Sequence, residues 1–359
     1  MMYYSTNKQA ANATLEEAVV TGLAADRGLY MPLTIKPLPK EFYDTIDQLS
    51  FQEIAFRVAE AFFGEDVPAD KLRAIVDDTL SFETPVVPVS ENIYALELFH
   101  GPTLAFKDVG GRFMARLLSH FIQGNAEKQV NVLVATSGDT GKAALEGFKD
   151  VDGTKIAVFY PNDGVSDIQR LQMTTQDGAN VAVGGILGNF DDAQSGVKKI
   201  FTDVEFKKWL DEKGYFLSSA NSINWGRLVP QIVYYVYAYA QLLAEEKITA
   251  GEKINVVVPT GNFGNILAAY YAKCMGIPVN KLICSSNRNK VLSGLLRACE
   301  KRPVSLDRLE KAVDDAHDAV DDPSVEDTLD VTDENVTKDD REDLEKAKDV
   351  LEDALENFG

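Results

Sequence analysis

The most informative segment of the sequence is His100-Gly101-Pro102-Thr103-Leu104-Ala105-Phe106-Lys107-Asp108-Val109-Gly110-Gly111-Arg112-Phe113. It places Lys107 between an aromatic residue and an acid, after a Gly-Pro turn and before an apolar run that predicts a helix at 113–121. A partly desolvated lysine has a lowered pKa and reaches the neutral amine form that attacks a carbonyl. For an isolated lysine, pairing with Asp108 is the simpler interpretation. Two glycine-rich loops further along the chain favour the reactive role.

Both loops follow a predicted strand and precede a predicted helix. This order is typical of anion sites, because the first amides of the helix and its dipole face the turn. After the strand at 131–135 come Thr136, Ser137, Gly138, Asp139, Thr140 and Gly141. After the strand at 254–259 come Thr260, Gly261, Asn262, Phe263, Gly264 and Asn265.

The first loop also invites comparison with a nucleotide P-loop, since Gly141 is followed by Lys142. A P-loop has four residues between its glycines, whereas Gly138 and Gly141 are separated by two. Ala143 also stands where a P-loop has a metal-binding Ser or Thr. We therefore reject the P-loop.

A third polar segment runs from Ser218 to Arg227 and has two interpretations. Asn and Ser favour helix N-caps, so the segment could cap a helix beginning at Pro230. Alternatively, a substrate phosphate could lie among Ser222, Asn224 and Arg227, with the guanidinium supplying charge. Without the other motifs, the cap is the better interpretation.

The alternation of strands and helices predicts the α/β class, with open, mostly parallel sheets and flanking helices in two subdomains. Residues 1–77 predict a small helical N-terminal domain, because Thr14 and Glu17 form a capping-box pattern and 51–63 has helical apolar spacing. The catalytic region is expected at 78–304. Residues 305–359 predict a helical acidic tail.

Composition excludes several classes of function. The formal charge is −20, of which the 21 acidic and 6 basic residues after position 304 carry −15, so neither part predicts a basic patch for nucleic acid. The 3 histidines form no ligand cluster, so no metal is expected. There is no apolar run of membrane-spanning length and no secretory signal, and the 3 cysteines have no disulfide spacing. We therefore expect no membrane partner and a cytoplasmic location.

The segment Leu98–Asp108 resembles the cofactor-lysine segment of threonine synthases, which are pyridoxal-phosphate enzymes of the tryptophan-synthase-β type. The resemblance covers about residues 1–292. It implies that Lys107 forms a Schiff base with pyridoxal phosphate and that O-phospho-L-homoserine and water become L-threonine and phosphate. It also implies a monomer or homodimer.

The resemblance further implies roles for individual residues. Phe106 would pack beside the cofactor ring, and Asp139 would lie near the ring or the substrate carboxylate. The cofactor phosphate would be held by Gly261, Asn262, Phe263, Gly264 and Asn265. Substrate would be bound by Thr136, Ser137, Gly138, Thr140, Ser222, Asn224 and Arg227.

Two alternatives stay open. The chain could be a serine or threonine dehydratase or a β-replacement enzyme of the same cofactor class. It could instead be an inactive fused scaffold, since the resemblance ends near Leu292 and the strands and hydroxyl partner for the pyridine nitrogen that should follow are not found. Lost strands would leave sheet faces uncovered, so we expect reduced or no turnover.

Overall fold

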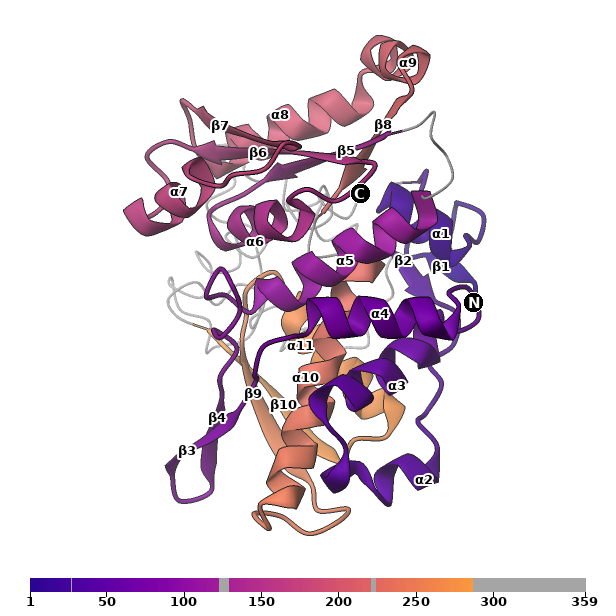
Figure 1. Ribbon diagram of the computed structural model, residues 1–359, viewed down its shortest axis with the longest axis vertical. Helices are drawn as coiled ribbons and strands as arrows, with labels where there is room; N and C mark the ends of the chain where they lie inside the picture. Colours follow the sequence, from indigo (N-terminus) through magenta and orange to yellow (C-terminus); the bar gives the residue numbers. More distant parts are fainter. Residues whose placement is uncertain (27, 123–128, 221–223, 287–359) are drawn as a thin grey trace, which may run out of the picture. The chain divides into compact units, whose positions relative to one another are not determined.

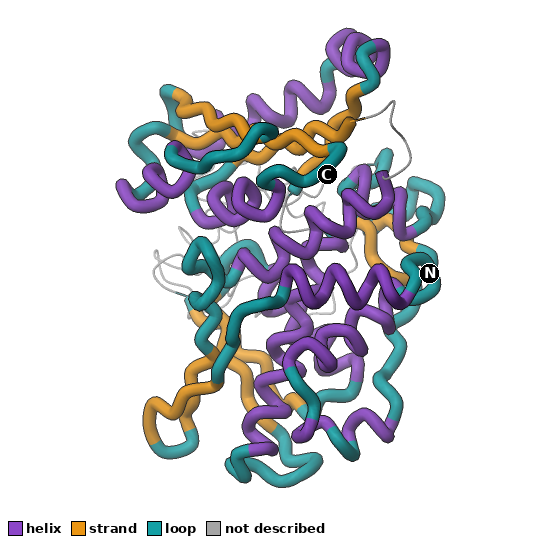
Figure 2. The backbone as a smooth tube through the Cα atoms, viewed as in Figure 1, coloured by secondary structure: helices purple, strands orange, loops and turns teal. Residues whose placement is uncertain are grey.

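The computed structural model describes residues 1–26, 28–122, 129–220 and 224–286 (Figures 1 and 2). The chain divides into two units. The first contains Met1–Ile254 and Leu267–Asn280, and the second contains Asn255–Ile266 and the chain from Lys281 onward. The predicted acidic tail at 305–359 and the predicted site residue Ser222 lie outside the described residues.

The first unit contains a parallel sheet of four strands. They are β5 (Gln129–Ala135), β6 (Thr154–Pro161), β7 (Val181–Ile186) and β8 (Tyr215–Ser219), in the order β7-β6-β5-β8. Neighbouring strands pair in parallel throughout. The α/β class and the parallel arrangement expected from the sequence are therefore confirmed.

Helices cover both faces of this sheet. Figure 1 shows α6 (Asp139–Phe148) on one side and α8 (Phe190–Thr202) on the other. The connections through α7 (Asp167–Thr174) and α9 (Val204–Glu212) complete the crossovers that parallel strands need. Because both faces are covered, β5 is an almost continuous apolar run, with Val130, Val132 and Val134 fully buried.

A second layer of the first unit is helical. It contains α1 (Leu15–Thr21), α2 (Lys40–Tyr43), the 3₁₀ turn η1 (Ile46–Gln48), α3 (Phe51–Phe63), α4 (Ala69–Thr79), α5 (Lys107–Ile122) and α10 (Trp225–Ala244). Trp225 is 1% exposed and lies 5.4–5.6 Å, between ring centroids, from Tyr3, Phe62 and Tyr271. This aromatic cluster ties the N-terminal segment to α10.

The N-terminal segment is less helical than predicted. Within it, β1 (Tyr3–Ser5) pairs antiparallel with β2 (Tyr30–Pro32). Beyond this segment, after α4, β3 (Val86–Ser90) and β4 (Ile93–Leu96) form an antiparallel hairpin. The capping box expected at Thr14 and Glu17 is present at the start of α1.

α5 begins at Lys107, which is six residues before the predicted helix start at Phe113. The predicted start is too late because glycine is a poor helix former, and Gly110 and Gly111 lie close to the true start of the helix. Both are required by close helix packing. A Cβ on Gly110 would lie 2.6 Å from the Arg227 carbonyl oxygen, and one on Gly111 would lie 2.8 Å from that of Ala143. α5 therefore packs backbone to backbone against α10 and α6.

The remaining elements are β9 (Ile254–Pro259), α11 (Gly264–Met275) and β10 (Val279–Ser285), and β9 and β10 form a two-stranded sheet. Most of both strands and the start of α11 belong to the second unit.

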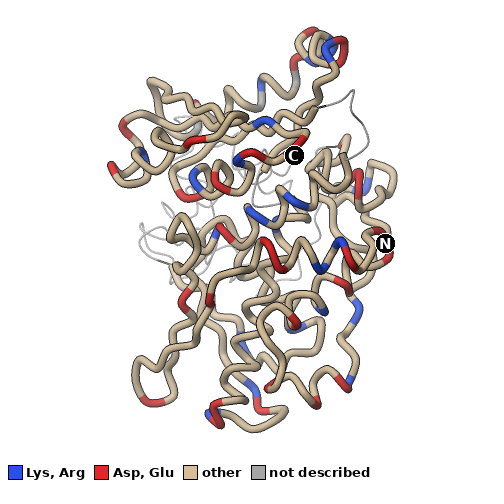
Figure 3. The backbone as a smooth tube through the Cα atoms, viewed as in Figure 1, with Lys and Arg blue, Asp and Glu red and all other residues tan. Residues whose placement is uncertain are grey.

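Charges of both signs are interspersed over the described chain (Figure 3). Within the described residues, no helix is long and apolar enough to cross a membrane.

Candidate active site

The loop before Lys107 is held by the acid beside that lysine. Asp108 is fully buried, and its carboxylate accepts hydrogen bonds from the Thr103 amide at 2.8 Å and the Thr103 hydroxyl at 2.5 Å. A Cβ on Gly101 would lie 2.5 Å from Asp108 Oδ2, so only glycine fits there. Asp108 therefore fixes the loop that leads into α5 and does not neutralise Lys107.

The amine of Lys107 has unusual surroundings. Its side chain is half-buried, and Nζ lies 4.8 Å from the centroid of the Phe106 ring. Burial, and secondly the positive charge of Arg227, lower the pKa of Lys107 to about 7, although the Asp139 carboxylate opposes this. A large fraction of the amine is thus neutral near pH 7, and a neutral amine is the nucleophile that carbonyl chemistry requires.

The loop between β5 and α6 is shaped by the hydroxyl of Thr136. This hydroxyl is buried and accepts hydrogen bonds from the Gly138 amide at 3.0 Å and the Gly141 amide at 2.9 Å. Gly138 has a φ of 139°, which side chains other than glycine rarely adopt. The predicted substrate role of the Thr136 hydroxyl thus competes with a structural one, while Ser137 is exposed and Thr140 is half-buried.

Asp139 lies at the start of α6 and has two partners that sequence reasoning missed. Lys142 Nζ is 3.2 Å from Asp139 Oδ1, and Gln169 Nε2 donates to the same oxygen at 2.8 Å. In the sequence, Lys142 stood out only as part of the rejected P-loop pattern, which did not predict its contact with Asp139. Gln169 has a sequence signal of its own, because Ser166 and Gln169 form a capping-box pattern at the start of α7.

The polar segment before α10 contains a helix cap, as one of its two interpretations expected. Asn224 is the N-cap of α10, with its side chain accepting from the Gly226 amide at 3.0 Å and donating to the Val19 carbonyl at 2.9 Å. The helix begins at Trp225 and continues through Pro230, where we had placed its start. Both polar ends of Asn224 are thereby occupied.

Arg227 is one turn into the same helix and only 1% exposed. Its guanidinium donates to the Ala220 carbonyl, and burial lowers its pKa to about 10. Arg227 and Asp139 both act electrostatically on Lys107, so the structure brings these three charged side chains into one neighbourhood.

The glycine loop at 260–265 belongs to the second unit. Thr260 donates through its hydroxyl to the Ser285 carbonyl at 2.9 Å, which anchors the loop to the end of β10. Gly261 has a φ of 46° and open space where a Cβ would lie, and Phe263 has a φ of 64°. Gly261 and Asn262 are exposed, whereas Phe263, Gly264 and Asn265 are half-buried.

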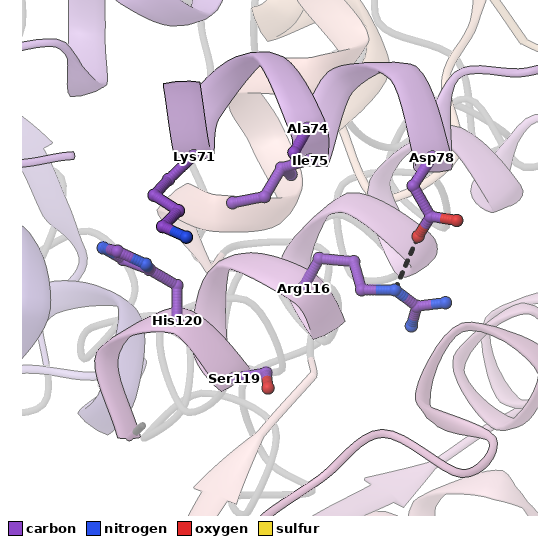
Figure 4. Close-up of a pocket in the computed structure, with 7 residues that line it drawn as sticks. All are labelled: Lys71, Ala74, Ile75, Asp78, Arg116, Ser119 and His120. Atoms are coloured by element: carbon purple, nitrogen blue, oxygen red, sulfur yellow. Dashed lines mark hydrogen bonds and ion pairs between the residues drawn. The ribbon is translucent and has the colours of Figure 1, made fainter. Parts of the chain in front are cut away.

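A separate open hollow of about 230 Å³ lies between α4 and α5 (Figure 4). Its lining includes Lys71, Asp78, Arg116 and His120, and Arg116 Nε pairs with Asp78 Oδ2 at 2.7 Å. None of the predicted site residues lines it, so we do not assign the chemistry to this hollow. Across the described ranges, no group of three or more His, Cys, Asp or Glu side chains could hold a metal ion.

Sequence comparison finds two families in the chain. "Threonine synthase N terminus" matches residues 2–80 and "Pyridoxal-phosphate dependent enzyme" matches residues 79–354. The second match continues past Leu292, so the end of the resemblance that we placed there is not confirmed by it.

Comparison with individual proteins also finds similarity to threonine synthases. The threonine synthase of Schizosaccharomyces pombe is 40% identical over 304 residues, covering 81% of this chain and 58% of that protein. The threonine synthase of Pseudomonas aeruginosa is 41% identical over 297 residues, covering 81% and 61%. The crystal structure of PLP-bound threonine synthase from Brucella melitensis superposes with a TM-score of 0.74 at 39% identity, covering 83% and 63%. The chain thus spans less than two thirds of the length of these relatives.

Proposed function

The chain belongs to the pyridoxal-phosphate-dependent enzyme family, and from this membership we propose that it carries threonine synthase activity. The reaction would convert O-phospho-L-homoserine and water to L-threonine and phosphate. The observation that carries the proposal is the half-buried Lys107, whose pKa is lowered to about 7 beside Arg227 and Asp139. The N-terminal match and the relatives near 40% identity support threonine synthase over other members of the family.

The residues present fit the cofactor. Pyridoxal phosphate, when bound, supplies an aldehyde for a lysine amine and an electron sink for the substrate carbons. Lys107 has the lowered pKa that lets it attack an aldehyde at neutral pH, and the Phe106 ring beside it offers an apolar face. Lys107 is also the group that we assign to proton movement at the substrate Cα and Cβ.

The other residues keep their expected roles as proposals. Gly261, Asn262, Phe263, Gly264 and Asn265 would hold the cofactor phosphate through backbone amides at the start of α11. Ser137, Gly138 and Thr140 would bind substrate near Asp139, and Arg227 would supply positive charge. Thr136 and Asn224 would contribute chiefly by shaping their segments, because their side chains are already engaged.

The proposal extends to organisation and setting. We infer a cytoplasmic enzyme that acts as a monomer or homodimer on a small-molecule substrate. We also keep the division into an N-terminal domain at 1–77, a catalytic region at 78–304 and a tail at 305–359.

The test is a single-turnover assay on the full chain loaded with pyridoxal phosphate. Phosphate released from O-phospho-L-homoserine is compared between the wild-type chain and Lys107→Ala. Stoichiometric phosphate release by the wild-type chain, with none by Lys107→Ala, supports threonine synthase activity. Turnover of free serine or threonine without phosphate release would replace it with the dehydratase alternative, and no reaction with either substrate would favour the inactive scaffold.

A further inference from the structure

The carboxylate of Asp139 is held from two sides at a single oxygen. Lys142, which is only 7% exposed, places Nζ 3.2 Å from Oδ1, and Gln169 donates its amide N–H to Oδ1 at 2.8 Å. Among the described residues, no donor reaches the other oxygen, Oδ2. The ion pair with Lys142 and the hydrogen bond from Gln169, both at Oδ1, fix the direction in which Oδ2 points, because a carboxylate is planar.

The group that donates the hydrogen bond to Asp139 has to be an amide. Gln169 closes the capping box of α7, with Oε1 accepting from the Ser166 amide and hydroxyl, both at 3.2 Å. A glutamate would close the same capping box equally well. Only glutamine also has an N–H for Asp139, so its two ends serve two different elements. A glutamate would instead place a second negative charge beside the first.

The amide also lies against the backbone of the loop. A Cβ on Gly138 would lie 2.4 Å from Gln169 Cδ, so the amide covers the glycine just before Asp139. The side chain of Gln169 thereby connects the start of α7 to the start of α6. Movement of this amide would release both the loop and the carboxylate.

We propose that Gln169, together with the buried Lys142, is a positioning residue that holds Asp139 in the orientation from which its charge acts on Lys107. The inference rests on the proposed function, because it concerns the lysine to which that function assigns the chemistry. Among the residues that the structure describes, the groups that act on the Lys107 amine are Asp139 on α6, Arg227 on α10 and the Phe106 ring. Asp108, on the same helix as Lys107, is turned to Thr103.

The experiment measures the pKa of Lys107 in the full chain before cofactor is added. Isotopic acetic anhydride labels the neutral amine in competition across a pH series, and peptide mass spectrometry reads the extent of labelling at Lys107. Gln169→Met keeps the volume of the side chain and removes the donor. Since the Asp139 charge raises the pKa of Lys107, we expect its midpoint to fall from about 7 by roughly half a unit in this variant.

Three comparisons separate positioning from simple support of the fold. Ser166→Ala removes the hydroxyl that caps α7 and one of the two bonds to Gln169 Oε1, whereas the Ser166 amide still donates to Oε1 and Gln169 still donates to Asp139. Gln176→Met removes a matched bond between the same two regions, the donation from Gln176 Nε2 to Glu146 Oε2 at 3.1 Å. Both controls should leave the midpoint of Lys107 unchanged. In an Asp139→Asn background, Gln169→Met should have no further effect, because the charge through which it acts is gone.

An unchanged midpoint in Gln169→Met, in a chain whose circular dichroism matches the wild type, would overturn the inference. An equal shift in Ser166→Ala or in the Asp139→Asn background would overturn it as well. If Gln169→Met does not fold, Gln169→Ala repeats the test with a smaller side chain. The labelling needs no cofactor or substrate, so this inference can fail while threonine synthase activity is found, and the reverse.

Discussion

Lys107 should titrate near neutral pH, about three units below an ordinary lysine, and this can be measured directly. Its pKa is lowered from the ordinary 10.5 to about 7 by burial, and secondly by the charge of Arg227. With a pKa of 7, about half of the amine is neutral at pH 7, whereas a solvated lysine is neutral at roughly 0.03%. Lys107 should therefore exceed an exposed lysine in neutral fraction by about three orders of magnitude.

Competitive acetylation from pH 5 to pH 11 measures the quantity, because only the neutral amine reacts. Peptides that carry exposed lysines in the same digest give the reference curve, which corrects for hydrolysis of the reagent. The predicted curve for Lys107 has its midpoint near pH 7 and reaches a plateau well before the reference curve rises. A midpoint near pH 10 would show that the amine is solvated, and the assignment of the chemistry to Lys107 would lose its physical basis.

Three further perturbations test other parts of the structure. Arg227→Met removes a buried positive charge beside Lys107, so the midpoint of Lys107 should rise by about one unit in the same labelling assay; a fall would contradict the electrostatics described above. Trp225→Ala empties the centre of the cluster of Tyr3, Phe62 and Tyr271 and should lower the free energy of unfolding in urea by about 3–5 kcal/mol, while Trp225→Phe should cost clearly less; equal costs would argue against a packed cluster. Burial alone would raise the pKa of Asp26, but hydrogen bonds from Ser5 and from backbone amides, including that of Gly28, outweigh it and lower the pKa to about 2, so this stabilisation is present above about pH 4 and is lost as pH falls toward 2. The free energy of unfolding should accordingly change less between about pH 4 and pH 2 in Asp26→Asn than in the wild type. An unchanged dependence on pH would show that this carboxylate does not contribute the stabilisation.

The sequence predicted those parts of the fold that depend on local pattern. The alternation of strands and helices was enough for the parallel sheet, because buried parallel strands are apolar runs with helices between them. The capping box at Thr14 was also readable, because all of its contacts lie within one turn.

Features that depend on contacts between distant segments were not readable. Gly110 and Gly111 look like helix breakers until α6 and α10 are seen against them. The strands β1 and β2 have three residues each, which is too short for a periodic signal, and their paired residues are 25 to 29 positions apart.

The candidate site likewise contains some residues that the sequence indicates and others that only contacts between distant segments reveal. Lys107 and the loop at 136–141 stood out by residue type, and the structure places Asp139 and Arg227 where their charges act on that lysine. Gln169 was hidden because its capping role is local and visible, whereas its bond to Asp139 joins positions 30 residues apart.

The proposed function requires that Lys107 is the residue that joins pyridoxal phosphate covalently. The full chain is incubated with pyridoxal phosphate, treated with sodium borohydride to make the linkage permanent, digested, and mapped by mass spectrometry. We predict one dominant modified peptide that carries the pyridoxyl group at Lys107, and no such peptide from Lys107→Ala. Modification at another lysine with Lys107 intact, or equal modification of the wild-type and Lys107→Ala chains across many lysines, would contradict the claim.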